Sequence, residues 1–112
     1  MGATFPPIIS GLPEADLPVP LARGWLLQGE TRQAVFIRLE PGAKVPEHSH
    51  GAQWGVVLDG ELELTVSGAT RTCRRGDSYE IPQNALHAAS SPGGALVLDL
   101  FADPHRYSPK RG

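Results

Sequence analysis

Proline and glycine interrupt this chain every few residues, and no other feature constrains its fold as strongly. The 112 residues include 13 glycines and 11 prolines, without a collagen-like repeat, and 40% of the chain is hydrophobic. Proline and glycine destabilise a helix interior by roughly 3 and 1 kcal/mol, so long helices are nearly excluded. A single all-β domain built from short strands and turns is therefore the favoured class.

Eight short strands are predicted between residues 25 and 101. The dipeptide Asp59-Gly60 is typical of a two-residue hairpin turn and is expected to join strands 53–58 and 61–67. The other predicted strands are 25–28, 33–40, 70–74, 78–81, 86–90 and 95–101. Many short strands at close spacing indicate a β-barrel or a two-sheet sandwich.

The two ends of the chain differ in composition from the middle. Residues 1–22 contain five prolines and are expected to form neither regular helix nor central strand. We expect them to form an extended, apolar arm that packs on the barrel, with a partly disordered arm as the alternative. The barrel is expected to span residues 23–103, followed by a loose polar tail over 104–112.

Charge and cysteine content argue against several classes of function. Ten Lys and Arg residues stand against twelve Asp and Glu, a formal net charge of −2, so nucleic-acid binding is not expected. Apolar runs are too short to cross a membrane, and no signal-peptide pattern occurs at the N-terminus. The single cysteine, Cys73, cannot form an internal disulfide, which fits a cytoplasmic location.

Three histidines make up the candidate site. His48 and His50 are two residues apart, so both imidazoles point to one face if the chain there is extended. Two adjacent imidazoles suit a divalent metal ion, and His87, in a later predicted strand, could supply a third ligand. A barrel whose histidines bind no metal and only form hydrogen bonds is the alternative.

Gln53 is the fourth candidate ligand, because the predicted hairpin places it inside the barrel. A two-residue turn at Asp59-Gly60 would pair Gln53 with Val66, on the apolar side of its strand. Gly51 would allow the bend that brings Gln53 to the same side as His50. Gln53 is interpreted either as a metal ligand or as a hydrogen-bond partner of a metal-bound water.

The spacing of these residues resembles two sequence motifs of the cupin family. The first motif is a glycine, five residues, His-x-His, a fourth ligand and a second glycine; the second is a glycine, five residues, a proline turn and a histidine. The matching positions are Gly42, His48, His50, Gln53, Gly60, Gly76, Pro82 and His87. The resemblance implies a small double-stranded β-helix, or jelly-roll, barrel that holds a divalent iron, manganese, nickel or zinc ion.

The chain departs from the family pattern at Gln53, which stands where a glutamate ligand is usual. Three imidazoles and an amide leave the charge of a divalent ion uncompensated, so the site is expected to favour a carboxylate or an enolate. The resemblance then implies a metal-dependent enzyme on a small anionic molecule, such as an oxygenase, an isomerase or a decarboxylase. A non-catalytic binding or sensing module is the alternative, so whether the chain is an enzyme stays open.

Two further residues are candidate substrate contacts. Arg38 could clamp a carboxylate if it faces inward, whereas the alternative puts its apolar neighbours inward and Arg38 in solvent. Tyr79 could line the pocket or simply fill its strand. Asp99 is expected on the outer face of its strand together with Val97 and Phe101, although a role in the pocket is possible.

An apolar stripe on the outer face predicts a covering partner. If Gln53 and its alternate neighbours face inward, Trp54, Val56 and Leu58 face outward. A contiguous stripe of this kind is too apolar to remain in water. Either the N-terminal arm or a second subunit of a two-fold homodimer is expected to cover it.

Overall fold

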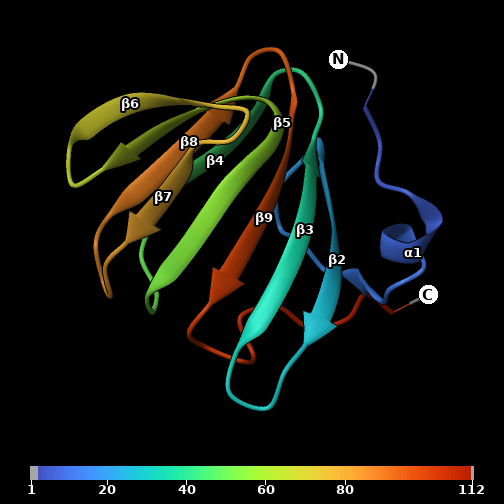
Figure 1. The fold of residues 1–112 in the computed structure, drawn as a ribbon. Helices are drawn as coiled ribbons and strands as arrows, with labels where there is room; N and C mark the ends of the chain where they lie inside the picture. Colours follow the sequence, from blue (N-terminus) through green and yellow to red (C-terminus); the bar gives the residue numbers. More distant parts are fainter. Residues whose placement is uncertain (1–2, 112) are drawn as a thin grey trace.

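The computed structural model describes residues 3–111, and its strands curl into the predicted all-β jelly-roll barrel (Figure 1). The elements, in chain order, are α1 (Pro7–Ser10), β1 (Glu14–Ala15), β2 (Ala22–Gln28), β3 (Gln33–Leu39), β4 (Ala43–His48), β5 (Gln53–Val66), β6 (Ala69–Arg74), β7 (Ser78–Ile81), β8 (His87–Ser91) and β9 (Ala95–Phe101). All strand pairs are antiparallel, in the order β1-β2-β3-β9-β5-β8-β4, with β6 and β7 also paired to β5. Within the described residues, no helix is long and apolar enough to span a membrane.

The long strand β5 joins the two halves of the barrel. Its first half pairs with β9 and β7, and its second half pairs with β8 and β6. The predicted hairpin at Asp59-Gly60 is therefore wrong, because one strand runs through both residues. The register against β9 shifts between Val57 and Asp59, and Gly60 has a φ of +76°. The dipeptide thus forms a bulge that bends β5 from one sheet into the other.

The bulge changes which alternate residues of β5 face the interior. Gly55 and Val57 are buried before it, whereas Leu62 and Leu64 are buried after it. Gln53, two residues before Gly55, faces the interior cavity. Its inward position follows from alternation along one strand, and not from the hairpin pairing that suggested it.

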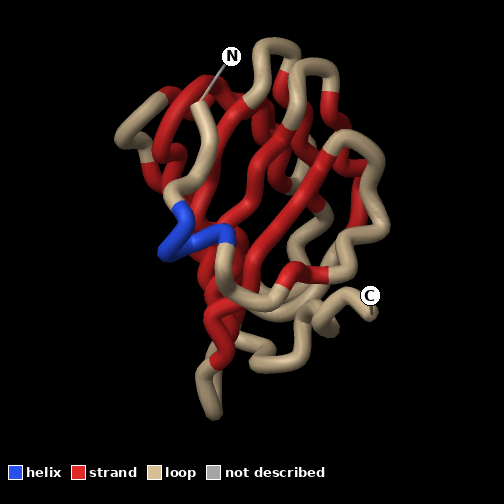
Figure 2. Tube along the Cα trace, turned by 90° about the vertical axis from the view of Figure 1, so that its right-hand side faces the viewer, coloured by secondary structure: helices blue, strands red, loops and turns tan. Residues whose placement is uncertain are grey.

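The N-terminal segment packs against the outer face of β2 and β3 (Figure 2). Phe5 is buried between Trp25 and Phe36, at ring-centroid distances of 5.8 and 5.7 Å. The expectation that prolines exclude helix is wrong for one turn, because α1 begins at Pro7, where a missing N–H does no harm. With β1 also paired to β2, an extended arm is not confirmed.

The same segment does not cover the apolar stripe on β5. Trp54 and Leu58 remain 44% and 39% exposed, and Leu100, paired with Trp54 across β9, is 41% exposed. The alternative in which the N-terminal arm covers this stripe is therefore wrong. The arm instead buries Trp25 and Leu96, on a different part of the outer face.

The C-terminal segment, expected to be loose, makes specific contacts with the barrel. The fully buried Gln33 donates a hydrogen bond to the Tyr107 carbonyl at 2.9 Å and accepts one from the Tyr107 N–H at 3.0 Å. Two main-chain hydrogen bonds also tie Ser108 and Lys110 to β1 and the residue after it. Tyr107 is thereby held beside the interior cavity.

Replacing Gly60 with alanine should destabilise the protein more than the same change at Gly68. Both glycines have a positive φ, +76° and +85°, which costs an L-residue about 1–2 kcal/mol. A Cβ at Gly60 would also overlap the Gly94 carbonyl oxygen, whereas one at Gly68 meets nothing within 4 Å. We expect a larger loss of unfolding free energy for Gly60→Ala in urea denaturation. Equal losses would contradict close packing at the bulge.

Candidate metal centre

Strands β4 and β8 and the loop after β4 bring the three histidines together. His48 ends β4, His87 begins β8, and the two residues are directly paired. His50 lies in the loop that leads to β5. The Asn84 N–H donates a hydrogen bond to the His50 carbonyl at 2.8 Å, so the turn before β8 holds this loop in place.

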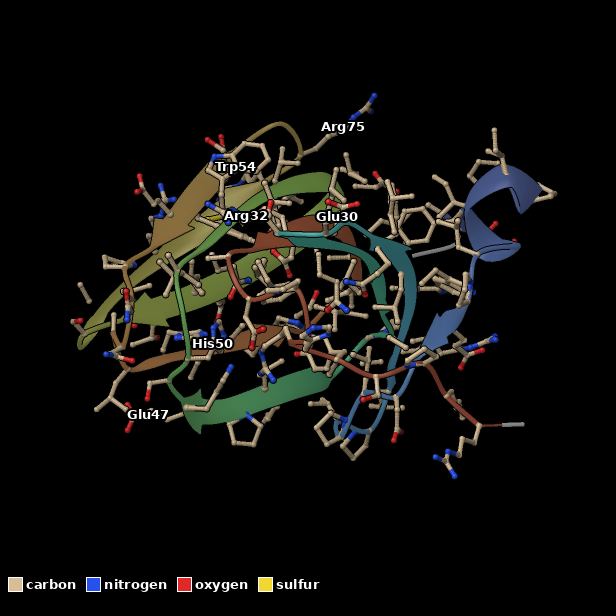
Figure 3. The ribbon with its side chains drawn as sticks, turned by 90° about the horizontal axis from the view of Figure 1, so that it is seen from below. Glu30, Arg32, Glu47, His50, Trp54 and Arg75 are labelled. Carbon is tan, nitrogen blue, oxygen red and sulfur yellow. The ribbon has the colours of Figure 1, made fainter. Side chains whose placement is uncertain are left out.

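The three imidazole rings cluster inside the barrel. Their centroids are 4.2 Å apart for His48 and His87, 4.7 Å for His50 and His87, and 5.1 Å for His48 and His50. One ring nitrogen from each lies within 4.8 Å of the other two. Seen from below, His50 lies within the ring of strands, whereas Glu47 and Trp54 lie outside it (Figure 3).

Hydrogen bonds to the main chain orient all three rings. Nδ1 of His48, His50 and His87 lies 2.8, 2.8 and 2.9 Å from the carbonyl oxygen of a residue one or two positions away. A carbonyl only accepts, so each Nδ1 carries the hydrogen and each Nε2 keeps its lone pair. Nε2 of His50 is buried without a hydrogen-bond partner among the described residues. Lone pairs that converge without a donor are suited to a metal ion.

Burial favours the neutral form of His50 and His87. Desolvation lowers the pKa of His50 from 6.5 to about 4, and it also lowers the pKa of His87. The positive charge of Arg106 acts in the same direction on both rings, whereas the hydrogen bonds to main-chain carbonyls oppose it. Because a histidine must be neutral to bind a metal, the site is prepared for binding at ordinary pH.

A small cavity adjoins the histidine cluster. Its volume is about 80 Å³ and its walls are mostly apolar, whereas pockets for drug-sized ligands measure roughly 300–1,000 Å³. The polar wall residues other than histidines include Gln53, Tyr79 and Asp99. The space therefore suits a few water molecules or a ligand with few heavy atoms.

Tyr79 and Gln53 both hydrogen-bond to Asp99. The Tyr79 hydroxyl donates to Oδ1 of Asp99 at 2.5 Å, and Gln53, which lines the same cavity, lowers the pKa of this carboxylate as a hydrogen-bond donor. Desolvation raises the pKa of Asp99 to about 6, against the lowering effect of these two hydrogen bonds. Burial and the nearby Asp99 raise the pKa of Tyr79 well above 10, so its hydroxyl stays protonated.

The expectation that Asp99 lies on the outer face is wrong. Asp99 is 6% exposed and lines the cavity, as do Val97 and Phe101 on the same side of β9. The three leucines of β9 suggested an inward apolar face, but they point outward, where Leu96 packs against the N-terminal segment. Asp99 pairs with Gly55 across the sheet, and this long-range pairing could not be inferred from local pattern.

Arg38 lies away from the site, whereas Arg106 lies near it. Arg38 lies on the outer face of β3, away from the cavity, with its Nε 3.0 Å from Oε1 of Glu40. Arg106, which the sequence did not single out, comes from the C-terminal segment. Its guanidinium lies 4.3 Å from the centre of the Tyr107 ring, and its charge reaches His50 and His87. No periodic pattern marks this segment, so sequence alone offered no signal for Arg106.

Comparison with known proteins agrees with this geometry. The family model of the cupin domain matches residues 35–101. The chain belongs to the cupin family. The resemblance inferred from the spacing of the two histidine motifs is thus confirmed.

Other cupins share this barrel over nearly its whole length. The chain is 25% identical to an RmlC-like cupin from Shewanella frigidimarina, with a TM-score of 0.74 and coverage of 99% of this chain and 93% of that one. It is 26% identical to KdgF from Halomonas sp., with a TM-score of 0.70 and coverage of 87% and 88%.

A curated relative contains a similar segment in a much longer chain. Over 75 residues this cupin is 33% identical to mannose-1-phosphate guanylyltransferase ManC from Salmonella typhimurium. The match covers 65% of this chain but only 15% of ManC. The similarity therefore concerns one part of that protein.

The pKa of His50 predicts how stability depends on pH in this cupin. Unfolded His50 takes up a proton below pH 6.5, whereas the folded residue does so only near pH 4. The contribution of His50 to the free energy of unfolding of the metal-free protein should therefore fall as the pH falls from 6.5 to 4. The His50→Gln variant has no imidazole to protonate at this position. The unfolding free energy of the wild type minus that of His50→Gln, measured by urea denaturation, should therefore decrease from pH 6.5 to pH 4.

A tail histidine provides the control for this experiment. His105 is exposed and outside the cluster, so His105→Gln should keep the wild-type pH dependence. Asp99 acts in the opposite direction, because its raised pKa lets the folded state bind a proton first, and the comparison between variants cancels this effect. If the difference in unfolding free energy between wild type and His50→Gln stays constant from pH 6.5 to 4, His50 is not held neutral.

Proposed function

We propose that this cupin is a metal-dependent enzyme that acts on a small anionic molecule, with His48, His50 and His87 as metal ligands. The convergence of three Nε2 lone pairs beside a cavity carries the proposal. A metal ion held there supplies a Lewis acid that polarises an oxygen atom of the bound molecule. Iron, manganese, nickel and zinc all bind imidazole, so the donor set does not choose between them.

The charge of the site supports an anionic substrate. Neutral imidazoles leave the two positive charges of a divalent ion uncompensated, and Arg106 adds a third charge nearby. The cavity-lining Asp99 is already engaged by Tyr79 and Gln53. A carboxylate or enolate oxygen of the ligand would therefore be stabilised here. The cavity of about 80 Å³ supports a small molecule.

Of an oxygenase, an isomerase and a decarboxylase, the cavity best supports an isomerase, whose reaction proceeds by proton transfer. Asp99 is a buried carboxylate in the same cavity as the histidines, so it can accept a proton from a carbon beside a carbonyl. The Tyr79 hydroxyl, 2.5 Å from Oδ1, holds this carboxylate in place. Enolisation needs these two elements together, a proton acceptor and an electrophile that stabilises the developing negative oxygen.

Protein purified without a histidine tag should bind about one divalent ion per chain. The His48→Ala/His87→Ala double variant should lose this ion, because it retains one imidazole, whereas His105→Ala should keep it. Elemental analysis after dialysis against zinc or ferrous ions and removal of loose metal measures the ratio. A metal content that is unchanged in the double variant contradicts the site.

Turnover distinguishes an enzyme from a binding or sensing module. In deuterium oxide, the metal-loaded protein should exchange the hydrogens beside the carbonyl of small 2-oxo acids, and Asp99→Ala should abolish the exchange. A binding module would change the visible spectrum of bound cobalt on adding these acids, without any exchange. Oxygen consumption without hydrogen exchange would point instead to an oxygenase.

We also propose that a second copy of the chain covers the exposed stripe on β5 and β9. Trp54, Leu58 and Leu100 lie on the outer face and stay 39–44% exposed, and a two-fold dimer would bury the same stripe of both copies. In analytical ultracentrifugation, we expect a dimer that Trp54→Lys dissociates. Ile8→Lys, at an apolar and more exposed position on α1 (84% against 44% for Trp54), should remain dimeric. A monomeric wild type contradicts this assembly.

We keep the cytoplasm as the proposed location. The single cysteine, Cys73, is fully buried and free, which is compatible with a reducing compartment. The net charge of −2 supports a small-molecule partner over nucleic acid.

A further inference from the structure

We propose that Asp99, held by Tyr79 across Gly55, positions Gln53 so that its amide oxygen faces the histidine cluster. The inference rests on the proposed metal site, because it gives Gln53 its place there. Asp99 acts through Gln53, so it is a positioning residue in this respect.

Three neighbouring strands set up this arrangement. Gly55 on β5 is paired with Tyr79 on β7 and with Asp99 on β9, so these residues form one row across the sheet. A Cβ on Gly55 would overlap both the Tyr79 ring and Oδ1 of Asp99. The missing side chain therefore leaves the space in which the Tyr79 hydroxyl reaches the carboxylate.

Gln53 lies between this row and the histidines. It precedes Gly55 by two residues on the same face of β5, and it is paired with Phe101, whose ring centroid is 5.5 Å from that of His50. On one side its side chain faces the Asp99 carboxylate, whose pKa it lowers as a hydrogen-bond donor. On the other side it borders the cavity that the three histidines line.

The chemistry of the two groups determines which way the amide points. An ionised carboxylate only accepts hydrogen bonds, whereas an amide offers a donating NH2 and an accepting oxygen. The Nε2 atom of Gln53 must therefore face Asp99, which leaves Oε1 to face the cavity. An amide oxygen in that position can serve as a fourth ligand, while Asp99 supplies a negative charge on the opposite side of the Gln53 amide.

The same match of an amide donor to a carboxylate acceptor explains why a glutamine suits position 53. A glutamate there would place its carboxylate against that of Asp99, with no hydrogen between two acceptors. Two like charges in contact inside a barrel are strongly unfavourable. The pair needs one carboxylate and one amide, and exchanging them should preserve the contact.

The test is a set of variants in which cobalt(II) affinity is measured by visible absorption of the full-length protein. Asp99→Asn should weaken binding by roughly 10–100-fold, because its amide NH2 meets that of Gln53. In the Gln53→Ala background, Asp99→Asn should have no further effect. Glu47→Gln removes a carboxylate beside His48 that points away from the barrel interior, and it should change the affinity less than about twofold.

The exchange variant Gln53→Glu/Asp99→Asn provides a rescue that a merely structural role would not. It restores one carboxylate and one amide in contact, so cobalt(II) affinity should return to at least the wild-type value. Gln53→Glu alone should not bind more tightly than wild type, although it adds a negative ligand. Tyr79→Phe should weaken binding in the same direction as Asp99→Asn, and by less.

The outcomes separate this inference from the metal site itself. A wild-type protein that binds no cobalt(II) overturns both. Normal wild-type binding together with an unaffected Asp99→Asn, or with an exchange variant no better than Asp99→Asn, overturns only the positioning role. If Asp99→Asn alone does not fold, the exchange variant and Tyr79→Phe provide the test. Wild-type affinity in Tyr79→Phe would contradict the positioning role, and so would reduced affinity in the exchange variant.

Discussion

The continuity of β5 through both sheets is the constraint on which the rest of this barrel depends. Its first half carries Gln53 and pairs with the strands of Tyr79 and Asp99, and its last residue, Val66, pairs with His87. The register of one strand therefore places residues from three others. Without the bulge at Asp59-Gly60, alternation would turn either Gln53 or the pair Leu62 and Leu64 outward. Burying each leucine contributes roughly 1.5–3 kcal/mol, which holds the bent register in place.

The interior combines an apolar core with a group of buried polar side chains, and hydrogen bonds offset part of the free-energy cost of burying these side chains. Main-chain carbonyls accept from each Nδ1 of the three histidines, and Asp99 accepts from Tyr79. Among the described residues, three buried side-chain nitrogens lack a hydrogen-bond partner: Nε2 of His50, Nε of Arg106 and Nε of Arg38. Only Nε2 of His50 belongs to the histidine cluster. Buried polar atoms without partners are rare in folded proteins and call for a specific explanation. The proposed metal ion would satisfy Nε2 of His50 and would also fit the two neighbouring rings.

Sequence predicted the parts of this protein that depend on local spacing. The His-x-His pair, His87 and the flanking glycines and proline were enough to identify the family, and alternation along 33–40 correctly turned Val35 and Ile37 inward. The hairpin was mispredicted because Asp-Gly, with glycine at positive φ, suits a bulge as well as a turn. Only pairing with β9, distant in sequence, decides between them.

The prediction that Asp99 lies on the outer face failed for a different reason, which concerns how β9 is buried. An ordinary half-buried strand puts apolar residues inside and polar ones outside, but β9 places Asp99 in the interior and its leucines outside. Such an inversion is stable only where the outer residues are covered and the inner carboxylate has partners. The N-terminal segment covers Leu96, and Tyr79 and Gln53 engage Asp99. Leu100 has no such cover within the described chain. The proposed second copy of the chain, seated on the surface around Trp54, would supply the cover that Leu100 lacks.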